Sequence, residues 1–146
     1  YMSYWIASSN RPNWEVMRNH SIWGVPKRNK SLLTRVAPGD KILIYVRAEQ
    51  HGNILLPSAI TGAFQVEKCF EDHRRLFIPP PQMGDEIFPY RFKLKPEKIF
   101  KEPVEFKPLI EELMFITNKT MWSDHLRVAM REIPEEDYKL ILTSGK

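Results

Sequence analysis

The sequence contains a single cysteine, Cys69, among its 146 residues. One cysteine cannot form a disulfide within its own chain, which suits a reducing compartment, so we expect a cytoplasmic protein. No apolar run approaches the roughly 18 residues that a membrane-spanning helix requires, and the longest candidate, residues 42–46, has the length of a strand. The start of the chain also lacks the charged and apolar regions of a signal peptide. We therefore expect no membrane partner.

Motifs of common catalytic and cofactor sites are missing as well. No P-loop, dinucleotide-binding glycine pattern or zinc-protease motif occurs, and a single cysteine excludes the zinc-deaminase pattern. Ser123, Asp124 and His125 carry the letters of a catalytic triad, but consecutive side chains point in different directions and cannot form a proton relay. Cys69 and His73 would share a face only on a helix, and two ligands do not make a metal site. We therefore expect no catalytic residue, metal or cofactor, and interpret the chain as a non-enzymatic protein.

Positive charge is concentrated in one part of the chain. The whole sequence has a formal net charge of +4 and an isoelectric point near 9.2. The segment 18–47 holds seven basic residues against one acid, Asp40, whereas the C-terminal stretch is balanced or acidic. Such an uneven distribution favours a polyanion as partner, nucleic acid above all, although a basic protein without such a partner has the same composition.

The hydrophobic pattern predicts one α+β domain over residues 1–146, built as a curled sheet or small barrel flanked by short helices. Hydrophobic residues make up 42% of the chain, enough for a core. Asn10 is expected to cap the first helix, and the long segment 72–88 to form an irregular loop. In the strand after that loop we expect Phe92 and Leu94 to point inward and Arg91 to point outward. Strands are predicted at 4–7, 42–46, 60–66 and 91–95, of which 60–66 is expected to be half-buried, and a hairpin is predicted around 51–53. Helices are predicted after Asn10, after Ser31 (which is expected to cap its helix), from Pro108 through Met114, and after Pro134.

The stretch 21–30 combines an aromatic ring with a short basic run. Trp23 precedes a glycine-proline turn, and Lys27, Arg28 and Lys30 follow within a few residues. An aromatic ring beside a turn can serve as a platform for a planar base, and the cations can bind phosphate. The alternative is that Trp23 packs in the core and that the cations form a solvated loop.

Several blocks together resemble an EVE domain. They are Tyr4-Trp5-Ile6, Asn13-Trp14, Ile22-Trp23-Gly24-Val25 and Pro38-Gly39-Asp40-Lys41, followed late in the chain by Trp122-Ser123, residues 130–134 and residues 136–138. The resemblance covers nearly the whole chain. It implies a PUA-like β-barrel flanked by helices, related to the YTH readers of methylated adenine.

The resemblance also implies a mechanism and a set of site residues. YTH-like domains take a modified base out of its stack and hold it in an aromatic pocket, in which Trp23 matches a wall. Ser9 and Asn10 match the polar residues that read the base edge, although Asn10 also suits a helix cap. The second wall is left open among loop aromatics, which include Phe88. We expect the base pocket to comprise Trp23, Asn10, Ser9, Phe77, Tyr90 and Trp122, and the phosphate-binding residues to comprise Lys27, Arg28, Lys30 and Arg91.

Together these observations predict a nucleic-acid-binding module that recognises a modified, methylated base flipped into an aromatic pocket. The partner is DNA or RNA, and the module acts alone or with a modification-dependent restriction system. The alternative is a general PUA-like RNA-binding protein without selectivity for modified bases.

Overall fold

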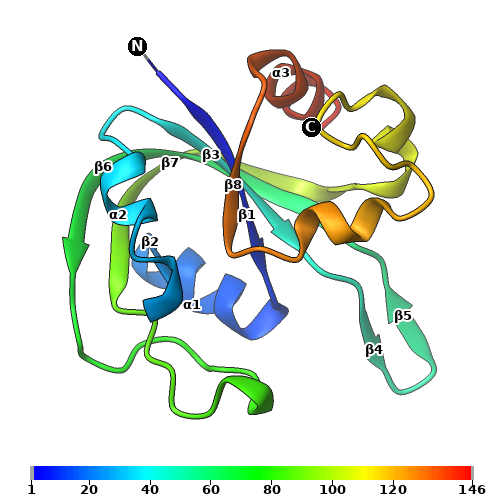
Figure 1. The fold of residues 1–146 in the computed structure, drawn as a ribbon. Coiled ribbons are helices and arrows are strands. Elements are labelled where there is room, and N and C mark those ends of the chain that lie inside the picture. The colour runs from blue at the N-terminus through cyan, green and yellow to red at the C-terminus, as the bar shows by residue number, and fades with distance from the viewer. Residues whose placement is uncertain (1, 146) are drawn as a thin grey trace.

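The computed structural model describes residues 2–145. A six-stranded sheet forms its centre in the order β2-β7-β6-β3-β1-β8, and β4 and β5 form a separate hairpin (Figure 1). The strands are β1 (Tyr4–Ser9), β2 (Ile22–Val25), β3 (Lys41–Val46), β4 (Glu49–His51), β5 (Ile54–Leu56), β6 (Ala59–Glu71), β7 (Tyr90–Glu105) and β8 (Met130–Ile133). The helices are α1 (Arg11–His20), α2 (Leu32–Arg35) and α3 (Glu135–Thr143), with short 3₁₀ helices at Lys27–Asn29, Pro81–Met83, Lys107–Glu112 and Trp122–Leu126. The predicted α+β, curled-sheet architecture is confirmed.

β1 is the strand that brings distant parts of the chain together. It pairs parallel with β3, so that Ser9 lies opposite Val46, and antiparallel with β8. Side chains on its two faces alternate between two cores, since Trp5 packs in one hydrophobic cluster and Ile6 in the other. Because β1 and β3 run in the same direction, the polar residues that follow the two strands lie at the same end of the sheet.

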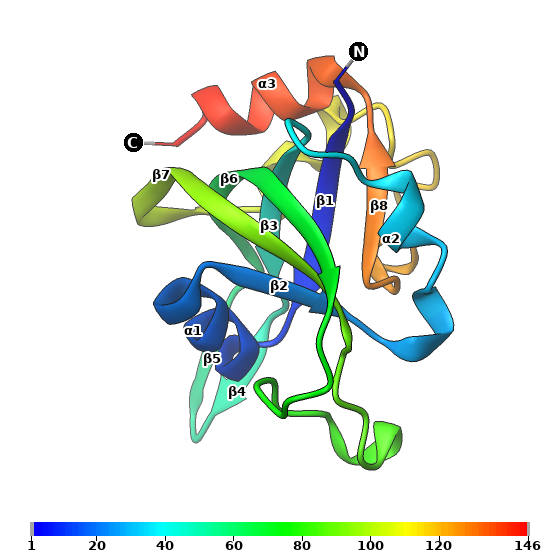
Figure 2. The ribbon, with the colours of Figure 1, turned by 90° about the vertical axis from the view of Figure 1, so that its left-hand side faces the viewer.

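The sheet curls because β6 and β7 are long and irregular. Their pairing shifts register at three points between Ile60 and Lys68, and such irregularities bend and twist strands. Figure 2 shows both strands sweeping across the molecule, with α3 over one end and α1 beside β2. Residues Ala59 to Phe64 are buried on both faces. The prediction of a half-buried strand was therefore wrong for this part of β6, because the curled sheet encloses it.

The predicted cap of the first helix is confirmed. The Oδ1 atom of Asn10 accepts a hydrogen bond from the backbone N–H of Asn13 at 2.9 Å and caps α1. Trp14 and Met17 of this helix are buried. The buried carboxylate of Asp40 accepts hydrogen bonds from the Trp5 indole and from two backbone N–H groups, and so fixes the turn before β3.

Three local predictions were wrong. Ser31 precedes α2 but its side chain makes no capping bond. The helix after Pro108 is a 3₁₀ helix that ends at Glu112, and Met114 beyond it is 56% exposed. Arg91 points inward and is 2% exposed, because the 72–88 loop folds over this end of β7 and surrounds its guanidinium with acceptors.

None of the helices within residues 2–145 combines the length and apolarity needed to cross a membrane. The domain predicted over residues 1–146 also includes positions 1 and 146, which lie outside the described residues.

Candidate functional site

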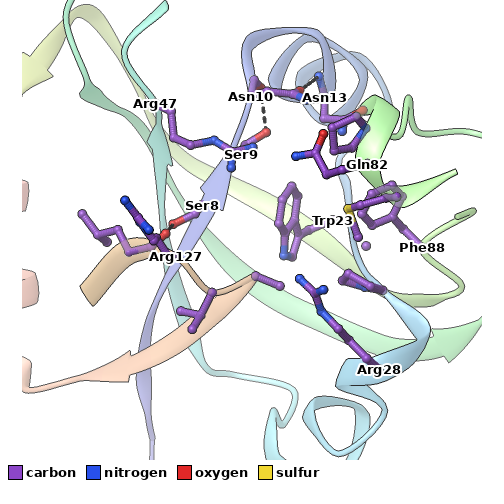
Figure 3. Close-up of a pocket in the computed structure, with 17 residues that line it drawn as sticks. Ser8, Ser9, Asn10, Asn13, Trp23, Arg28, Arg47, Gln82, Phe88 and Arg127 are labelled. Carbon is purple, nitrogen blue, oxygen red and sulfur yellow. Dashed lines mark hydrogen bonds between the residues drawn. The ribbon is translucent and has the colours of Figure 1, made fainter. Parts of the chain in front are cut away.

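A cavity of about 260 Å³ opens where β1 and β3 end. Four separate segments line it: the end of β1 with the start of α1, the β2 strand with Arg28, the 80–88 part of the long loop, and residues 126–129 before β8. Arg47, just after β3, completes the lining (Figure 3). The cavity therefore depends on the pairing of β1 with β3 and β8, which brings these segments to one place.

Trp23 forms the aromatic side of the cavity. It sits on β2 opposite Phe92 of β7 and is 5% exposed. Its ring packs edge-on against Phe77 at 6.2 Å, and Phe77 packs in the same way against Phe88 at 5.9 Å. The indole Nε1 of Trp23 is buried and has no hydrogen-bond partner among residues 2–145. An unpaired buried donor is costly, at about 1–3 kcal/mol, so this N–H is a ready site for an acceptor.

The polar side of the cavity comes from the β1–α1 junction. The buried Ser9 hydroxyl donates to the Asn10 carbonyl at 2.8 Å. Asn10 uses its Oδ1 as the helix cap and also lines the cavity. Its predicted role in reading a base edge stays a prediction. Its amide nitrogen makes no hydrogen bond within residues 2–145 and can donate to a ligand.

Asn13 attaches the long loop to α1. Its Nδ2 donates to the Ile78 carbonyl at 2.9 Å and its Oδ1 accepts from the Ile78 N–H at 2.7 Å. This two-bond contact joins residues 65 positions apart. It fixes the loop that supplies Gln82 and Phe88 to the cavity.

Phe88 has a strained backbone at the edge of the cavity. Its φ angle is +54°, in the left-handed region that bulky residues rarely adopt. The carboxylate of Glu86 accepts hydrogen bonds from the N–H groups of Ile87, Phe88 and Lys27, and holds this conformation. A Cβ on Gly24 would lie 2.9 Å from the Phe88 carbonyl oxygen, so only glycine fits there.

Arg91 supports the loop and lies away from the cavity lining. Its guanidinium donates to the carbonyls of Phe88 at 3.0 Å and Ile87 at 3.1 Å, and also to that of Arg74. Burial lowers the pKa of Arg91, while nearby Asp72 opposes this effect. The pKa of the Asp72 carboxyl lies well below its usual range, first because Arg74 donates to it and also because Arg91 is close. With its donors occupied, Arg91 does not fit the predicted phosphate-binding role.

Three arginines surround the cavity, and among the described residues none of those that line it is acidic. Arg28, Arg47 and Arg127 are all exposed. Arg127 pairs with Asp124 at 3.3 Å, whereas Arg28 and Arg47 form no ion pair within residues 2–145. In Figure 3, Arg28 lies beside the Trp23 indole, and Arg47 and Arg127 lie near Ser9 and Ser8. This arrangement attracts an anionic ligand.

The structure brings together only part of the predicted site. Trp23, Asn10, Ser9 and Arg28 line the cavity, as does the loop aromatic Phe88. Phe77 packs behind Trp23. The residues outside the lining are Tyr90 on β7, Trp122 (which lines a second cavity), Lys27, Lys30 and Arg91.

Sequence reasoning did not single out Arg47, Gln82 or Arg127 as site residues. Arg47 was counted in the basic segment, and that charge was the one available signal. Gln82 lines the cavity because the long loop folds back over it, and Arg127 lines the cavity because β8 pairs with β1. Neither contact can be recognised from a local sequence pattern.

Most of the side chains considered for a metal site or a catalytic triad have other partners in the described part of the chain. Within residues 2–145 no group of three or more His, Cys, Asp and Glu side chains could hold a metal ion. Cys69 lies on β6 and its thiol donates to the Val36 carbonyl, while His73 contacts Glu71, so the helical pairing of Cys69 and His73 does not exist. His125 accepts from a backbone N–H and Asp124 pairs with Arg127.

The fold belongs to the PUA-like class. The human THYN1 protein, solved in complex with 5-methylcytosine containing DNA, matches with a TM-score of 0.62 at 14% identity, over 97% of this chain and 96% of that chain. The Mmi1 YTH domain, solved in complex with RNA, matches with a TM-score of 0.63 at 13% identity, over 98% of this chain and 79% of that chain.

The sequence comparisons define the family within this class. The EVE domain model matches residues 3–144. The UPF0310 protein PH1033 of Pyrococcus horikoshii is 52% identical over 144 residues, which cover 96% of this chain and 97% of that protein. The chain belongs to the EVE domain family.

Proposed function

We propose that this EVE domain binds nucleic acid without transforming it and holds one extruded base in the Trp23 cavity. The observation that carries the proposal is the combination of a buried, unpaired indole N–H with three surrounding arginines and no lining acid. An aromatic wall and an unpaired donor suit a base, and exposed arginines suit the phosphates beside it.

The cavity suits a planar base in size and in chemistry. Its volume of about 260 Å³ is close to the roughly 300 Å³ at the lower end of ligand pockets. The Trp23 N–H and the Asn10 amide can donate to ring nitrogens or carbonyl oxygens of a base. Stacking on an aromatic side chain contributes roughly 1–3 kcal/mol, while extruding a base costs a few kcal/mol.

Phosphate contacts therefore supply much of the net affinity. Each contact to a single strand contributes about 0.7 to the salt slope, so three arginines predict a slope near −2. Arg28, Arg47 and Arg127 are exposed and need little reorganisation to meet phosphates.

We further propose that the bound base is modified, with methylation as the leading choice. Support comes from the shared fold with THYN1, whose complex holds 5-methylcytosine containing DNA. Burying one methyl group contributes only about 0.8 kcal/mol. We expect a preference of roughly tenfold to a hundredfold over the unmodified base, which requires an unfavourable contact with the unmodified form as well.

The alternative is a general PUA-like RNA-binding protein without modified-base selectivity. The exposed arginines favour this alternative, since they would bind any phosphate backbone. Association with a modification-dependent restriction system and a cytoplasmic location stay predictions.

The test is fluorescence polarisation with labelled single-stranded DNA and RNA oligonucleotides at two salt concentrations. Each oligonucleotide carries one methylated adenine, methylated cytosine, hydroxymethylated cytosine or no modification. Selective binding to one modified base supports the reader function and names its ligand. Equal, salt-sensitive binding to all supports the alternative, and absence of binding at low salt contradicts both.

Two variants separate stacking from charge. Trp23→Ala would leave a core cavity costing about 3–5 kcal/mol, so Trp23→Phe is the better change. It should weaken binding about fivefold or more through the lost N–H, with the salt slope unchanged. Arg28→Gln should reduce the magnitude of the salt slope by about 0.7 for every oligonucleotide sequence. Arg18→Gln, an equal charge change at an exposed position of α1 outside the cavity lining, is the control.

A further inference from the structure

A second cavity of about 380 Å³ lies on the other side of Arg47. Its walls are mostly apolar and come from the end of β3, the β4–β5 hairpin and the start of the Trp122–Leu126 helix. Tyr45, Leu55, Pro57 and Trp122 provide the apolar surface. Tyr45 and Trp122 both pack on Phe106, at 5.0 and 5.6 Å between ring centroids, which fixes the two aromatic walls.

Two elements connect this cavity to the Trp23 cavity. Arg47 lines both of them. The Trp122–Leu126 helix also reaches both, since Trp122 lines the second cavity while Leu126 and Arg127 line the first. The two cavities are therefore neighbours along one surface, with an unpaired cation between them.

The charges around the second cavity also suit a nucleic-acid strand. Arg47 and Lys107 line it with one acid, Glu105. Aromatic and apolar walls beside cations are the arrangement that binds single-stranded nucleic acid, in which bases contact the rings and phosphates meet the cations. A strand that places a base against Trp23 and a phosphate on Arg47 continues towards Trp122.

We infer that the second cavity binds another nucleotide of the same single strand, with Arg47 holding one of the phosphates of the backbone that joins the two bases. The inference rests on the proposed function of the Trp23 cavity. From Trp122 to Leu126 the 3₁₀ helix rises about 8 Å at roughly 2.0 Å per residue. A stacked strand advances about 3.4 Å per nucleotide, which places the two bases about two to three nucleotides apart. The ligand is therefore a single-stranded segment of at least about three nucleotides.

The β4–β5 hairpin offers a matched pair of variants. Leu55 lines the second cavity and is 62% exposed, whereas neighbouring Ile54 does not line it and is 64% exposed. Successive strand residues point to opposite faces. Leu55→Glu and Ile54→Glu add the same charge to the same hairpin, and neither removes a core side chain. Equal melting temperatures would verify that both variants fold.

The experiment measures the affinity of wild type and both variants for fluorescein-labelled single-stranded hexanucleotides and dinucleotides of random sequence, as DNA and as RNA. Leu55→Glu should weaken hexanucleotide binding by about fivefold to a hundredfold, the range of one lost base contact. It should leave dinucleotide binding within about twofold of wild type. Ile54→Glu should leave hexanucleotide and dinucleotide binding within about twofold of wild type, because Ile54 is not among the residues that line the cavity.

The outcomes separate this inference from the proposed function. Equal hexanucleotide affinities for Leu55→Glu and Ile54→Glu would overturn the second nucleotide site and leave the Trp23 cavity standing. They would indicate that the second cavity has another occupant, such as an apolar peptide. A wild-type protein that binds no hexanucleotide at low salt would overturn both. Selective loss in Leu55→Glu, with dinucleotide binding retained, supports the extended site.

Discussion

Replacing Arg91 with glutamine tests whether this residue holds the loop or binds phosphate. Its guanidinium donates to three backbone carbonyls and is 2% exposed. A hydrogen bond to a charged group contributes about 1.5–3 kcal/mol. Because one guanidinium serves all three carbonyls, the contributions are not additive, and we expect a loss of about 3–5 kcal/mol in the free energy of unfolding. For a domain of this size, that loss lowers the melting temperature by about 6–20 °C.

The assay combines thermal unfolding with the salt dependence of oligonucleotide binding. Lys93→Gln is the matched control, since Lys93 is exposed on the same strand and loses the same charge. Arg91→Gln should unfold earlier and bind more weakly, with the salt slope of wild type, whereas Lys93→Gln should melt within about 2 °C of wild type. An Arg91→Gln protein with an unchanged melting temperature and a shallower salt slope would refute the reasoning. It would indicate that Arg91 contacts phosphate, as the sequence predicted.

Three further perturbations address the same loop. Gly24→Ala should destabilise the domain by about 1–3 kcal/mol, because its Cβ would meet the Phe77 ring at 2.7 Å; an unchanged melting temperature would contradict this. Asn13→Ala should speed proteolysis within the 72–88 loop, since both bonds to Ile78 are lost; cleavage at the wild-type rate would argue against the clamp. Asp72→Asn should make the stability of the domain fall less steeply as the pH is lowered. The folded-state pKa of Asp72 lies below its unfolded value, so its contribution is present above about pH 4 and is lost as the pH falls. Parallel falls in melting temperature between pH 4 and 2 for wild type and variant would contradict that role.

The parts of the fold that sequence predicted well are those determined by neighbours in the chain. The Asn10 cap, the helix that follows it (α1) and the strand predicted at 42–46 (within β3) all follow from residues within a few positions of one another. Trp23 was identified because its aromatic ring, the Gly24 and Pro26 pair and the basic run are adjacent in sequence, although Gly24 lies in strand β2 and not in the predicted turn. Arg28 came from the same block and does line the cavity.

The rest depends on contacts between distant segments. Alternation along β7 predicts that Arg91 faces out, but the loop covers that side and turns it into an interior. The left-handed backbone of Phe88 is held by Glu86 and Arg91 nearby, and distant residues in turn position these two: the Lys27 N–H donates to Glu86, and Arg91 donates to the Arg74 carbonyl. Arg127 reaches the cavity only because β8 pairs with β1.

The pairing of β1 with both β3 and β8 also determines when the site can exist. β1 begins at Tyr4 and β8 ends at Ile133, so one wall of the cavity is made near the start of the chain and another near its end. Contacts of such long sequence separation form late and slowly. During synthesis a nascent chain has Trp23 and its basic neighbours long before residues 126–129 are available to close the cavity. Under the proposed function, the basic segment alone would attract a nucleic acid, but the cavity would hold a base only after β8 has docked. We therefore expect selective binding only from the finished fold.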